Sequence, residues 1–305
     1  MKDRYVLDGI VPSLNTPFDE HGRVDFPSLT RLVEHHLDEG AVGFLTTAQA
    51  AEVFELSVQE RIAIIKLVRD MTKGRSKVIA GATSRSHAES LVLAEAAVTA
   101  GCDGVLVEVP SFAKADRVQT INFFEAFAER GMDMLMIQDL DWTGCGMDLS
   151  LISELFERIP SFRSIKVETN PSGPKYSAIL EATTNRLHVC GGWASLQLIE
   201  ALDRGVSAFL PTALTRPLVR VIRSYRQQDR DAAKRWFYSI LPVLAFTRQH
   251  LDTSIVFHKM LFHRRGIFST PGVRKRVNTF DSYHRQYAEE LLIYLEAIEA
   301  DLATE

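Results

Sequence analysis

The stretch SIKVETNPSGPK, residues 164–175, places Lys166 inside a run that otherwise has the composition of a buried strand. The run ends at NPSG, residues 170–173, whose residue types favour turns. Lysine is among the residues least often buried in proteins. Because side chains alternate along a strand, Ser164, Lys166 and Glu168 share one side of it. Three polar side chains therefore point the same way from a strand that should be buried.

The rest of the chain repeats the pattern of a short aliphatic run followed by a segment of helical period. The other runs are GIVPSLNTPF (9–18), VGFLTT (42–47), KVIAGAT (77–83), GVLVEVP (104–110), DMLMIQD (133–139), RLHVCGG (186–192) and SAFLPTA (207–213). Helix-like stretches occupy 26–40, 57–74, 87–101 and 195–205, and each closes on glycine. Ser57, with Glu60 three residues later, predicts a capping box.

Eight strand–helix units in one chain predict a (β/α)₈ TIM barrel. The competing fold is a doubly wound open sheet, which usually has a glycine-rich phosphate turn after its first strand. PSLNTPF, residues 12–18, is not such a turn. We therefore expect the barrel over residues 1–220.

The sequence from about Pro217 onward is mostly helical in pattern, with helices expected in 230–250, 254–265 and 278–302. This part is too apolar for a free linker. We expect a C-terminal helical extension, residues 221–305, that packs on the barrel or on another subunit.

The composition is ordinary for a globular protein: 305 residues, 46% hydrophobic and 24% charged, with a net charge of −4. That charge gives no footprint for nucleic acid or an anionic membrane surface. The three cysteines lack metal-ligand spacing, and their odd number argues against structural disulfides. The N-terminus lacks the apolar core of a signal peptide, and no stretch approaches the roughly 20 apolar residues of a membrane span. We expect a cytoplasmic protein.

Lys166 lies near the end of the sixth expected strand, the edge where TIM barrels carry their active sites. One interpretation is a lysine whose stem packs inside while its amine reaches water or pairs with Glu168. The other is a Schiff-base lysine, because a barrel interior disfavours the charged form of an amine and a neutral amine attacks carbonyl groups. Position alone leaves both open.

Several motifs resemble, in order and spacing, the dihydrodipicolinate synthase/N-acetylneuraminate lyase family. They are GIVPSLNTPFDEHGRVD (9–25), the segment of Glu52 with ELSVQER (55–61), GCDGVLVEVPSF (101–112) and IKVET (165–169). The resemblance covers roughly the first 220 residues. It implies a (β/α)₈ barrel, commonly a tetramer or a dimer of dimers, that forms an imine between Lys166 and pyruvate or another 2-keto acid.

The chain departs from the family pattern where the family moves protons. AQAAE (48–52) replaces Gly-Thr-Thr-Gly-Glu, so the relay hydroxyls are missing. Phe112 follows Pro110 and Ser111 where the family has a tyrosine pair, and Gln138 replaces the fifth-strand tyrosine. Trp142 stands near the position where the synthases carry an arginine. Dihydrodipicolinate synthase activity is therefore not expected.

MIQDLDWTG (136–144) is similar to the run in L-2-keto-3-deoxyarabonate dehydratase-like members, which also have Gln-Asp. The resemblance implies a lysine-dependent dehydratase of a 2-keto-3-deoxy sugar acid. From the imine, loss of a C3 proton gives an enamine, and the C4 hydroxyl then leaves. The alternatives are a pyruvate-dependent aldolase of the N-acetylneuraminate lyase or dihydrodipicolinate synthase type, and a barrel that binds a keto or sugar acid without catalysis.

With the tyrosine absent, Glu168 is our candidate for proton transfer beside Lys166 and Gln138; its alternative is a plain ion pair. Glu108 is a mid-strand charge that points into the barrel unless the register slips by one. The candidate substrate contacts are Gln49, Ala50, Ala51, Ser111, Phe112, Asp139, Gly191 and Gly192. For Asp139 a role in capping nearby backbone N–H groups competes with substrate contact.

We expect no metal and no added cofactor. The sequence has no metal-ligand cluster, nucleotide loop or nucleophile elbow, and the lysine itself serves as the electron sink. His35 and His36 occupy adjacent helix positions, which we expect to face different directions. His188 is expected to be a satisfied core residue. The only partners we expect are a small 2-keto acid and further copies of the chain, in a tetramer or a dimer.

Overall fold

The computed structural model describes residues 7–114, 116–274, 277 and 280–304. Within them, parallel strands form one eight-stranded sheet in the order β1-β8-β7-β6-β5-β4-β3-β2. The strands are β1 (Gly9–Ile10), β2 (Gly43–Thr46), β3 (Lys77–Gly81), β4 (Gly104–Glu108), β5 (Leu135–Asp141), β6 (Phe162–Thr169), β7 (His188–Gly191) and β8 (Ala208–Phe209). Each expected strand is present, and the formal ends of the shortest ones fall inside the expected runs.

The chain that follows β1 closes the sheet against β2. Ser13 and Leu45 form a parallel bridge, and the Leu45 N–H donates to the Pro12 carbonyl over 2.9 Å. A doubly wound sheet would leave its two edge strands apart. The predicted (β/α)₈ barrel is therefore confirmed.

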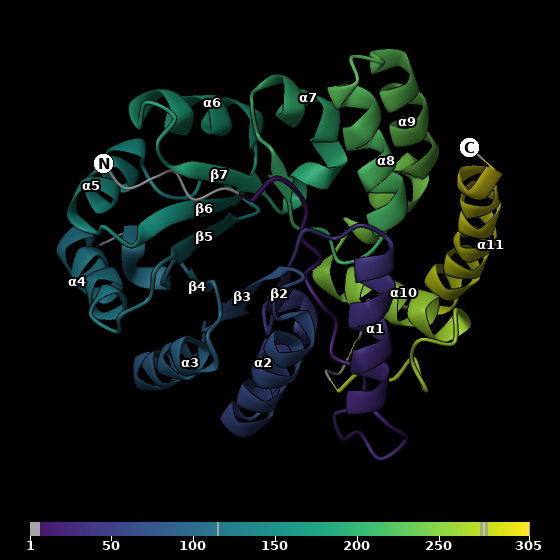
Figure 1. Ribbon diagram of the computed structural model, residues 1–305, viewed down its shortest axis with the longest axis horizontal. Helices are drawn as coiled ribbons and strands as arrows, with labels where there is room; N and C mark the ends of the chain where they lie inside the picture. Colours follow the sequence, from purple (N-terminus) through teal and green to yellow (C-terminus); the bar gives the residue numbers. More distant parts are fainter. Residues whose placement is uncertain (1–6, 115, 275–276, 278–279, 305) are drawn as a thin grey trace.

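Helices alternate with the strands and surround them (Figure 1). They are α1 (Phe26–Asp38), α2 (Val58–Thr72), α3 (His87–Ala100), α4 (Arg117–Ala128), α5 (Leu149–Arg158), α6 (Gly173–Ala182), α7 (Leu198–Asp203) and α8 (Thr215–Arg226). Short 3₁₀ turns, η1 (Gln49–Ala51), η2 (Val53–Glu55), η3 (Ser111–Lys114) and η4 (Trp193–Gln197), follow β2, β4 and β7. The capping box of Ser57 and Glu60 is confirmed at the start of α2.

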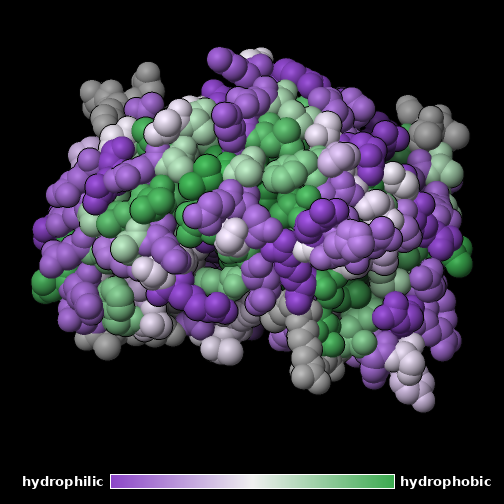
Figure 2. Space-filling model, turned by 90° about the horizontal axis from the view of Figure 1, so that it is seen from below, coloured by the Kyte–Doolittle hydropathy of each residue, from purple (hydrophilic) through white to green (hydrophobic). Residues whose placement is uncertain are grey.

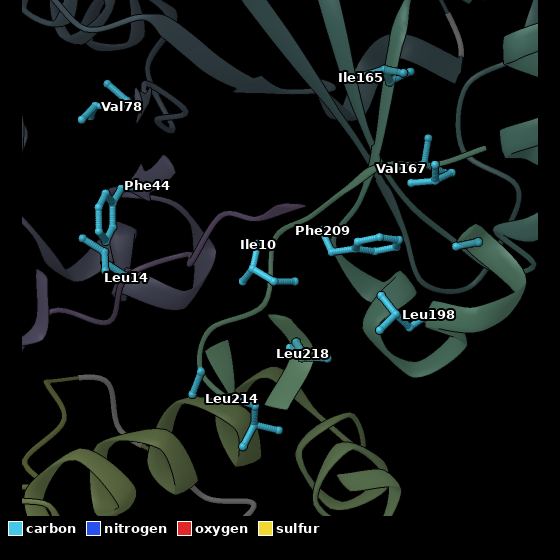
Figure 3. Packing of buried hydrophobic residues seen from close by; sticks show 14 of the residues in the cluster. Ile10, Leu14, Phe44, Val78, Ile165, Val167, Leu198, Phe209, Leu214 and Leu218 are labelled. Atoms are coloured by element: carbon cyan, nitrogen blue, oxygen red, sulfur yellow. The ribbon is translucent and has the colours of Figure 1, made fainter. Parts of the chain in front are cut away.

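Two apolar clusters separate the inside of the barrel from its outside. The inner cluster consists of Leu7, Val11, Leu45, Ala48, Ile79, Leu106, Met134, Met136, Cys190, Ala208 and Leu210. The larger outer cluster lies between strands and helices, and Figure 3 shows Ile165 and Val167 of β6 in it, with Phe209 beside Leu198. Because Ile165 and Val167 face outward, the residues that alternate with them in β6 face the barrel interior.

Three further helices, α9 (Arg230–Thr247), α10 (Leu251–Arg264) and α11 (Ser282–Thr304), lie together at one side of the barrel, next to α8 and α1 (Figure 1). α9 packs on α8, and α10 reaches η1 at the mouth of the barrel. The predicted division at residues 220/221 falls within α8. Residues 278 and 279, where the last helix was expected to begin, lie outside the described residues.

The face of the molecule drawn in Figure 2 is mostly hydrophilic, with hydrophobic patches between the charged and polar side chains. Among the described residues, no helix combines the length and the apolar character that crossing a bilayer requires.

Candidate active site

The end of β6 carries a buried amine–carboxylate pair inside the barrel. Lys166 is 4% exposed, and its Nζ lies 3.2 Å from Oε2 of Glu168. The amide of Gln138, on the neighbouring strand β5, donates to the same oxygen over 2.5 Å. Gln138 and Lys166 are paired in the register of β5 and β6, so both side chains leave the sheet on the same face. The structure thus brings together the three residues that we proposed as catalytic.

Glycine at position 192 makes room for this pair. A Cβ there would lie 2.0 Å from Oε1 of Glu168 and 2.5 Å from Cε of Lys166. The carbonyl of Gly192 accepts a hydrogen bond of 3.1 Å from the guanidinium of Arg248, which also contacts Ser195. Burial lowers the pKa of Arg248 to about 10, and the charge of Glu168 opposes that shift. Arg248, at the end of α9, therefore contacts Gly192, the residue that lies against Lys166 and Glu168.

The turn after β2 lies on the other side of the barrel mouth. Nε2 of Gln49 donates to Oε2 of Glu108 over 2.7 Å. The carbonyl of Ala50 accepts from the Asn15 side chain, and Ala51 is buried behind it. Ala50 and Ala51 are both buried, and the N–H of Ala51 donates to the carbonyl of Ala48. Glu108 is the end of β4, where burial raises its pKa and the hydrogen bond from Gln49 opposes that shift.

Asp139 holds a loop rather than standing free in the mouth. Its Oδ2 lies 2.5 Å from Nζ of Lys175, and its Oδ1 accepts from the N–H of Met147 over 2.9 Å. Lys175 in turn donates to the carbonyls of Cys145 and Met147. These contacts are the ones expected if Asp139 caps backbone N–H groups, the alternative to substrate contact in the sequence analysis.

A hydrogen-bonded chain lies under Lys166. Oγ of Ser164 is 2.8 Å from Nδ1 of His188, whose Nε2 lies 2.9 Å from the carbonyl of Leu7. The carbonyl can only accept, so Nε2 carries the proton and Nδ1 accepts from the serine. Burial raises the pKa of the adjacent thiol of Cys190 to about 12. His188 is therefore a satisfied core residue, as expected.

Two open cavities meet at the end of β4. One of about 610 Å³ is lined by Glu108, Ser111 and Phe112 together with residues of α3 and α4. The other, of about 580 Å³, shares Glu108 and Ser111 and extends to Asp139 and the loop after β5. A third, of about 270 Å³, lies between the loop after β5 and Arg248. Glu108 thus borders both larger cavities while facing the barrel interior.

The expectation that His35 and His36 face different directions is wrong. Their donor atoms and a carboxylate oxygen of Glu39 all lie within 4.8 Å of one another. The three- and four-residue spacings to Glu39 bring both rings to the same carboxylate. Arg265 lies 3.3 Å from Nε2 of His35, and Arg216 lies 4.0 Å from Glu39. Two guanidinium groups so close oppose the binding of a divalent cation.

The sequence analysis missed Arg248 and Lys175. Lys175 lies in the first turn of α6, and Arg248 is the residue that caps the C-terminal end of α9. Arg248 lies in no motif that the sequence pattern marks, and Lys175 ends the stretch 164–175 without a feature that indicates its partner. Only the packing of α9 and α6 on the barrel brings them to the mouth.

Comparison with known proteins identifies the family to which the chain belongs. The Dihydrodipicolinate synthetase family profile matches residues 6–293. The chain belongs to this family. The resemblance expected from the sequence is thereby confirmed, and with it the class of enzyme: family members are lyases or aldolases that form a lysine imine with a keto acid.

Two relatives illustrate the distance within the family. A DapA-like lyase of Rhizobium meliloti is 31% identical over 160 residues, which span 52% of this chain and 53% of that protein. A 4-hydroxy-tetrahydrodipicolinate synthase of Parasynechococcus marenigrum is 28% identical over 238 residues, 77% of this chain and 78% of the relative. The matched stretch is thus about half of the first relative and more than three quarters of the second.

Solved structures share the fold at lower identity. Dihydrodipicolinate synthase from Rhodopseudomonas palustris superposes with a TM-score of 0.87 at 22% identity, covering 96% of this chain and all of that one. YagE, a prophage protein of Escherichia coli K12 in the dihydrodipicolinic acid synthase family and in complex with pyruvate, gives 0.85 at 20% identity, with 96% and 99% coverage. At these identities the comparison concerns the fold.

Proposed function

We propose that the protein is a Schiff-base dehydratase of a 2-keto-3-deoxy sugar acid and that Lys166 forms the imine. The observation that carries this proposal is the buried contact of 3.2 Å between Lys166 and Glu168, with Gln138 on the same carboxylate oxygen. The carboxylate can take the proton that the amine must lose before it attacks the C2 carbonyl. Loss of water from that adduct gives the iminium.

Glu168 then acts as the base for the C3 proton of the imine. Its carboxylate lies beside Nζ of Lys166, and C3 is one bond from the carbon that Nζ binds. A positioned carboxylate of this kind typically contributes about 10²–10⁴-fold to a proton transfer. Gln138 holds the carboxylate but has no proton to exchange near neutral pH. This arrangement serves C3 deprotonation without a tyrosine.

In this proposal the remaining predicted residues contact the substrate. The turn Gln49–Ala51 would hold the substrate carboxylate through the backbone N–H groups of Gln49 and Ala50, because the N–H of Ala51 already donates to the carbonyl of Ala48. Ser111 and Phe112 would contact the sugar chain from the end of β4, and Gly191 and Gly192 would line the side nearest Lys166. Asp139 would contact the substrate from the loop after β5, which it holds through Met147 and Lys175. No added cofactor is needed in this mechanism, because the iminium accepts the electrons.

A synthase or aldolase reaction is the second candidate, because relatives such as the Parasynechococcus protein are 4-hydroxy-tetrahydrodipicolinate synthases. Retro-aldol cleavage needs a base on the C4 hydroxyl, the role of the family tyrosine that Gln138 replaces. A glutamine amide cannot take that proton. The dehydratase reaction places no such demand on position 138, and we prefer it for this reason. A barrel that only binds its acid would gain nothing from burying an amine.

Borohydride trapping tests the proposal. Wild-type protein incubated with pyruvate, or with 2-keto-3-deoxy-L-arabonate, and then reduced should carry one adduct, which mass spectrometry maps to Lys166. The variant Lys166→Arg should trap nothing, because a guanidinium stays protonated. The matched control is Lys175→Arg, which changes a second lysine at the mouth and should trap normally.

The products separate the candidates. Water loss from 2-keto-3-deoxy-L-arabonate without release of pyruvate selects the dehydratase, and release of pyruvate selects the aldolase. Trapping that persists in Lys166→Arg, or that maps to Lys175, removes Lys166 from the mechanism. No trapping of either acid by the wild type leaves the binding-only barrel.

We further propose that the protein assembles as a homo-oligomer, a dimer or a tetramer. Its described surface exposes large apolar side chains on α9 and α11, among them Tyr238 at 57%, Tyr283 at 79% and Ile293 at 58%. Apolar side chains gathered on helices outside the barrel are common at subunit interfaces.

A further inference from the structure

A second carboxylate, Glu108, faces Lys166 across the barrel mouth. In the register of the sheet, Glu108 of β4 pairs with Gln138 of β5, which pairs with Lys166 of β6. Residues paired in this way project on the same face of a sheet. The three side chains therefore enter the barrel at one level, and the outer two start from strands roughly 10 Å apart.

The two carboxylates of the mouth are held in the same way. Gln49 donates to Oε2 of Glu108 over 2.7 Å, and Gln138 donates to Oε2 of Glu168 over 2.5 Å. Each glutamine fixes one oxygen of its carboxylate and supplies no exchangeable proton near neutral pH.

Their surroundings nevertheless differ. Glu168 lies 3.2 Å from the amine of Lys166. Glu108 has no such ion pair among the described contacts. Burial raises the pKa of Glu108 and the charge of Glu168 adds to this shift, while the hydrogen bond from Gln49 and the charge of Lys166 oppose it. Two carboxyl groups in such different environments are suited to acid and base roles in one reaction.

Glu108 is also the one of the two that borders the open cavities. It lines both the cavity of about 610 Å³ and that of about 580 Å³. A substrate held at Lys166 by C2 and extending toward these cavities brings its C4 hydroxyl toward β4.

We infer that Glu108 is the general acid that protonates the leaving C4 hydroxyl, an inference that rests on the dehydratase reaction proposed above. Glu168 removes the C3 proton, and the electron pair of that C–H bond forms C2=C3 as the iminium becomes an enamine. The nitrogen lone pair then restores the iminium, the C2=C3 pair moves to C3=C4, and the C4–O bond breaks with its pair on oxygen. The proton of Glu108 completes the water molecule.

The step is balanced. Glu168 gains one proton, Glu108 loses one, and exchange with solvent returns both to their starting states. Hydrolysis of the iminium consumes one water and releases the amine of Lys166 with the unsaturated 2-keto acid. No oxidant, reductant or further reactant enters.

The variant Glu108→Gln tests the assignment because it keeps the shape and removes the acid. We expect it to form the borohydride-trapped adduct with 2-keto-3-deoxy-L-arabonate and to exchange the C3 proton with deuterated solvent at near the wild-type rate. Its rate of water loss should fall by about 10²–10⁴-fold. With the 4-deoxy-4-fluoro analogue, the rate of fluoride release by Glu108→Gln should fall by less than about tenfold, because fluoride leaves without being protonated first.

Two controls accompany this variant. Glu125→Gln makes the same substitution on the surface of α4, where Glu125 pairs with Arg158, and should behave as the wild type. Glu108→Ala opens space next to the cavities, and formate should restore its water loss in proportion to formate concentration.

Each outcome decides the assignment. Water loss by Glu108→Gln within about threefold of the wild type overturns it. Loss of trapping and of C3 exchange in Glu108→Gln, together with no rescue of Glu108→Ala by formate, gives Glu108 a structural role instead. If the wild type traps the acid at Lys166 but releases pyruvate, the proposed dehydratase function fails, and this inference fails with it for a reason that the product itself reveals.

Discussion

By the sequence resemblance, Gln138 corresponds to the family tyrosine, and its contacts show what an amide does at this position. It is 1% exposed and donates its only short hydrogen bond among the described contacts to Oε2 of Glu168. A phenol can exchange a proton with substrate, whereas an amide can only hold a neighbour. In the dehydratase reaction that we propose, proton transfer therefore falls to the carboxylates beside position 138.

Replacing Gln138 by Leu should separate positioning from proton transfer. The change removes the donor to Glu168 at nearly constant volume and leaves the contact between Lys166 and Glu168 in place. We expect normal trapping of pyruvate and a fall in kcat of about 10–100-fold, with KM little changed, because the carboxylate is no longer held toward C3. Steady-state kinetics of water loss measures both constants.

A second substitution at position 138 tests whether Glu168 acts as the base. Gln138→Glu places a like charge on the oxygen that the amide now contacts, so one of the two carboxylates must keep a proton. The acid limb of the pH–kcat profile should move to higher pH in Gln138→Glu and stay in place in Gln138→Leu. An unchanged limb in both variants would show that Glu168 does not act as the base.

The sequence predicted this part of the site because it depends on alternation. Ile165 and Val167 of β6 belong to the outer core, which places Lys166 and Glu168 inside, and the same rule places Glu108 inside from β4. Alternation says nothing about which side chains meet. The hydrogen bond from Gln49 to Glu108 spans 59 residues and follows from the closure of the barrel.

The turn that should hold the substrate carboxylate depends on a helix from the far end of the chain. Glu52, in the left-handed conformation with φ of 55°, lies between η1 and η2 and forms a buried ion pair with Lys259 of α10. Its second oxygen accepts from the N–H of Arg274 over 2.9 Å. Nζ of Lys259 also donates to the carbonyl of Gly272 and lies 4.1 Å from the centre of the Phe18 ring.

This pair connects residues 207 positions apart, so no local pattern could predict it. Glu52 belongs to the motif AQAAE (48–52), but nothing in that motif indicates its partner. The partner became visible only when α10 was placed against η1. The same reasoning explains why Arg248, at the end of α9, was missed.

Replacing Lys259 by Met should destabilise the protein and loosen the turn. Removing one member of a fully buried ion pair leaves the other charge uncompensated, which typically costs about 3–5 kcal/mol. We expect a loss of that order in the free energy of unfolding from urea titration, and a higher KM for the keto acid. The control is Arg264→Met on the same helix, whose exposed pair with Glu296 should contribute less than about 1 kcal/mol.

The double variant Glu52→Gln with Lys259→Met gives the opposing test. Removing both charges should recover a large part of the loss, because no buried charge remains unpaired. If Lys259→Met is no less stable than Arg264→Met, the pair does not hold the turn.

The barrel and the C-terminal helices also meet at a cluster of charged side chains at the C-terminal end of α1. Glu39 follows α1 and is 7% exposed; near it lie Arg216 of α8, Arg265 after α10, Glu299 of α11 and the ring of His35. Burial raises the pKa of Glu39 to about 7, Glu299 adds to this shift, and the two arginines oppose it. Elements from both ends of the chain thus share one titrating group.

The titration of Glu39 makes the free energy of unfolding of the protein depend on pH. Between pH 4.5, the ordinary pKa, and about 7, folded Glu39 keeps a proton that the unfolded chain has released. The unfolding free energy therefore falls as pH rises through this window, and the full penalty is present above pH 7. His35 acts in the opposite direction: burial lowers its pKa to about 4, so its contribution to stability rises with pH between about 4 and 6.5.

A comparison with Glu39→Gln isolates the carboxyl group, because the contribution of His35 is common to both proteins. Glutamine keeps the shape of the protonated acid and does not titrate. The difference in unfolding free energy, variant minus wild type, should be small near pH 4.5 and grow to about 2–3 kcal/mol by pH 7.5, given about 1.4 kcal/mol per pKa unit. Urea titrations at a series of pH values measure it. A difference that stays constant across this range would mean that Glu39 is already ionised in the folded protein, and that the arginines from α8 and α10 outweigh its burial.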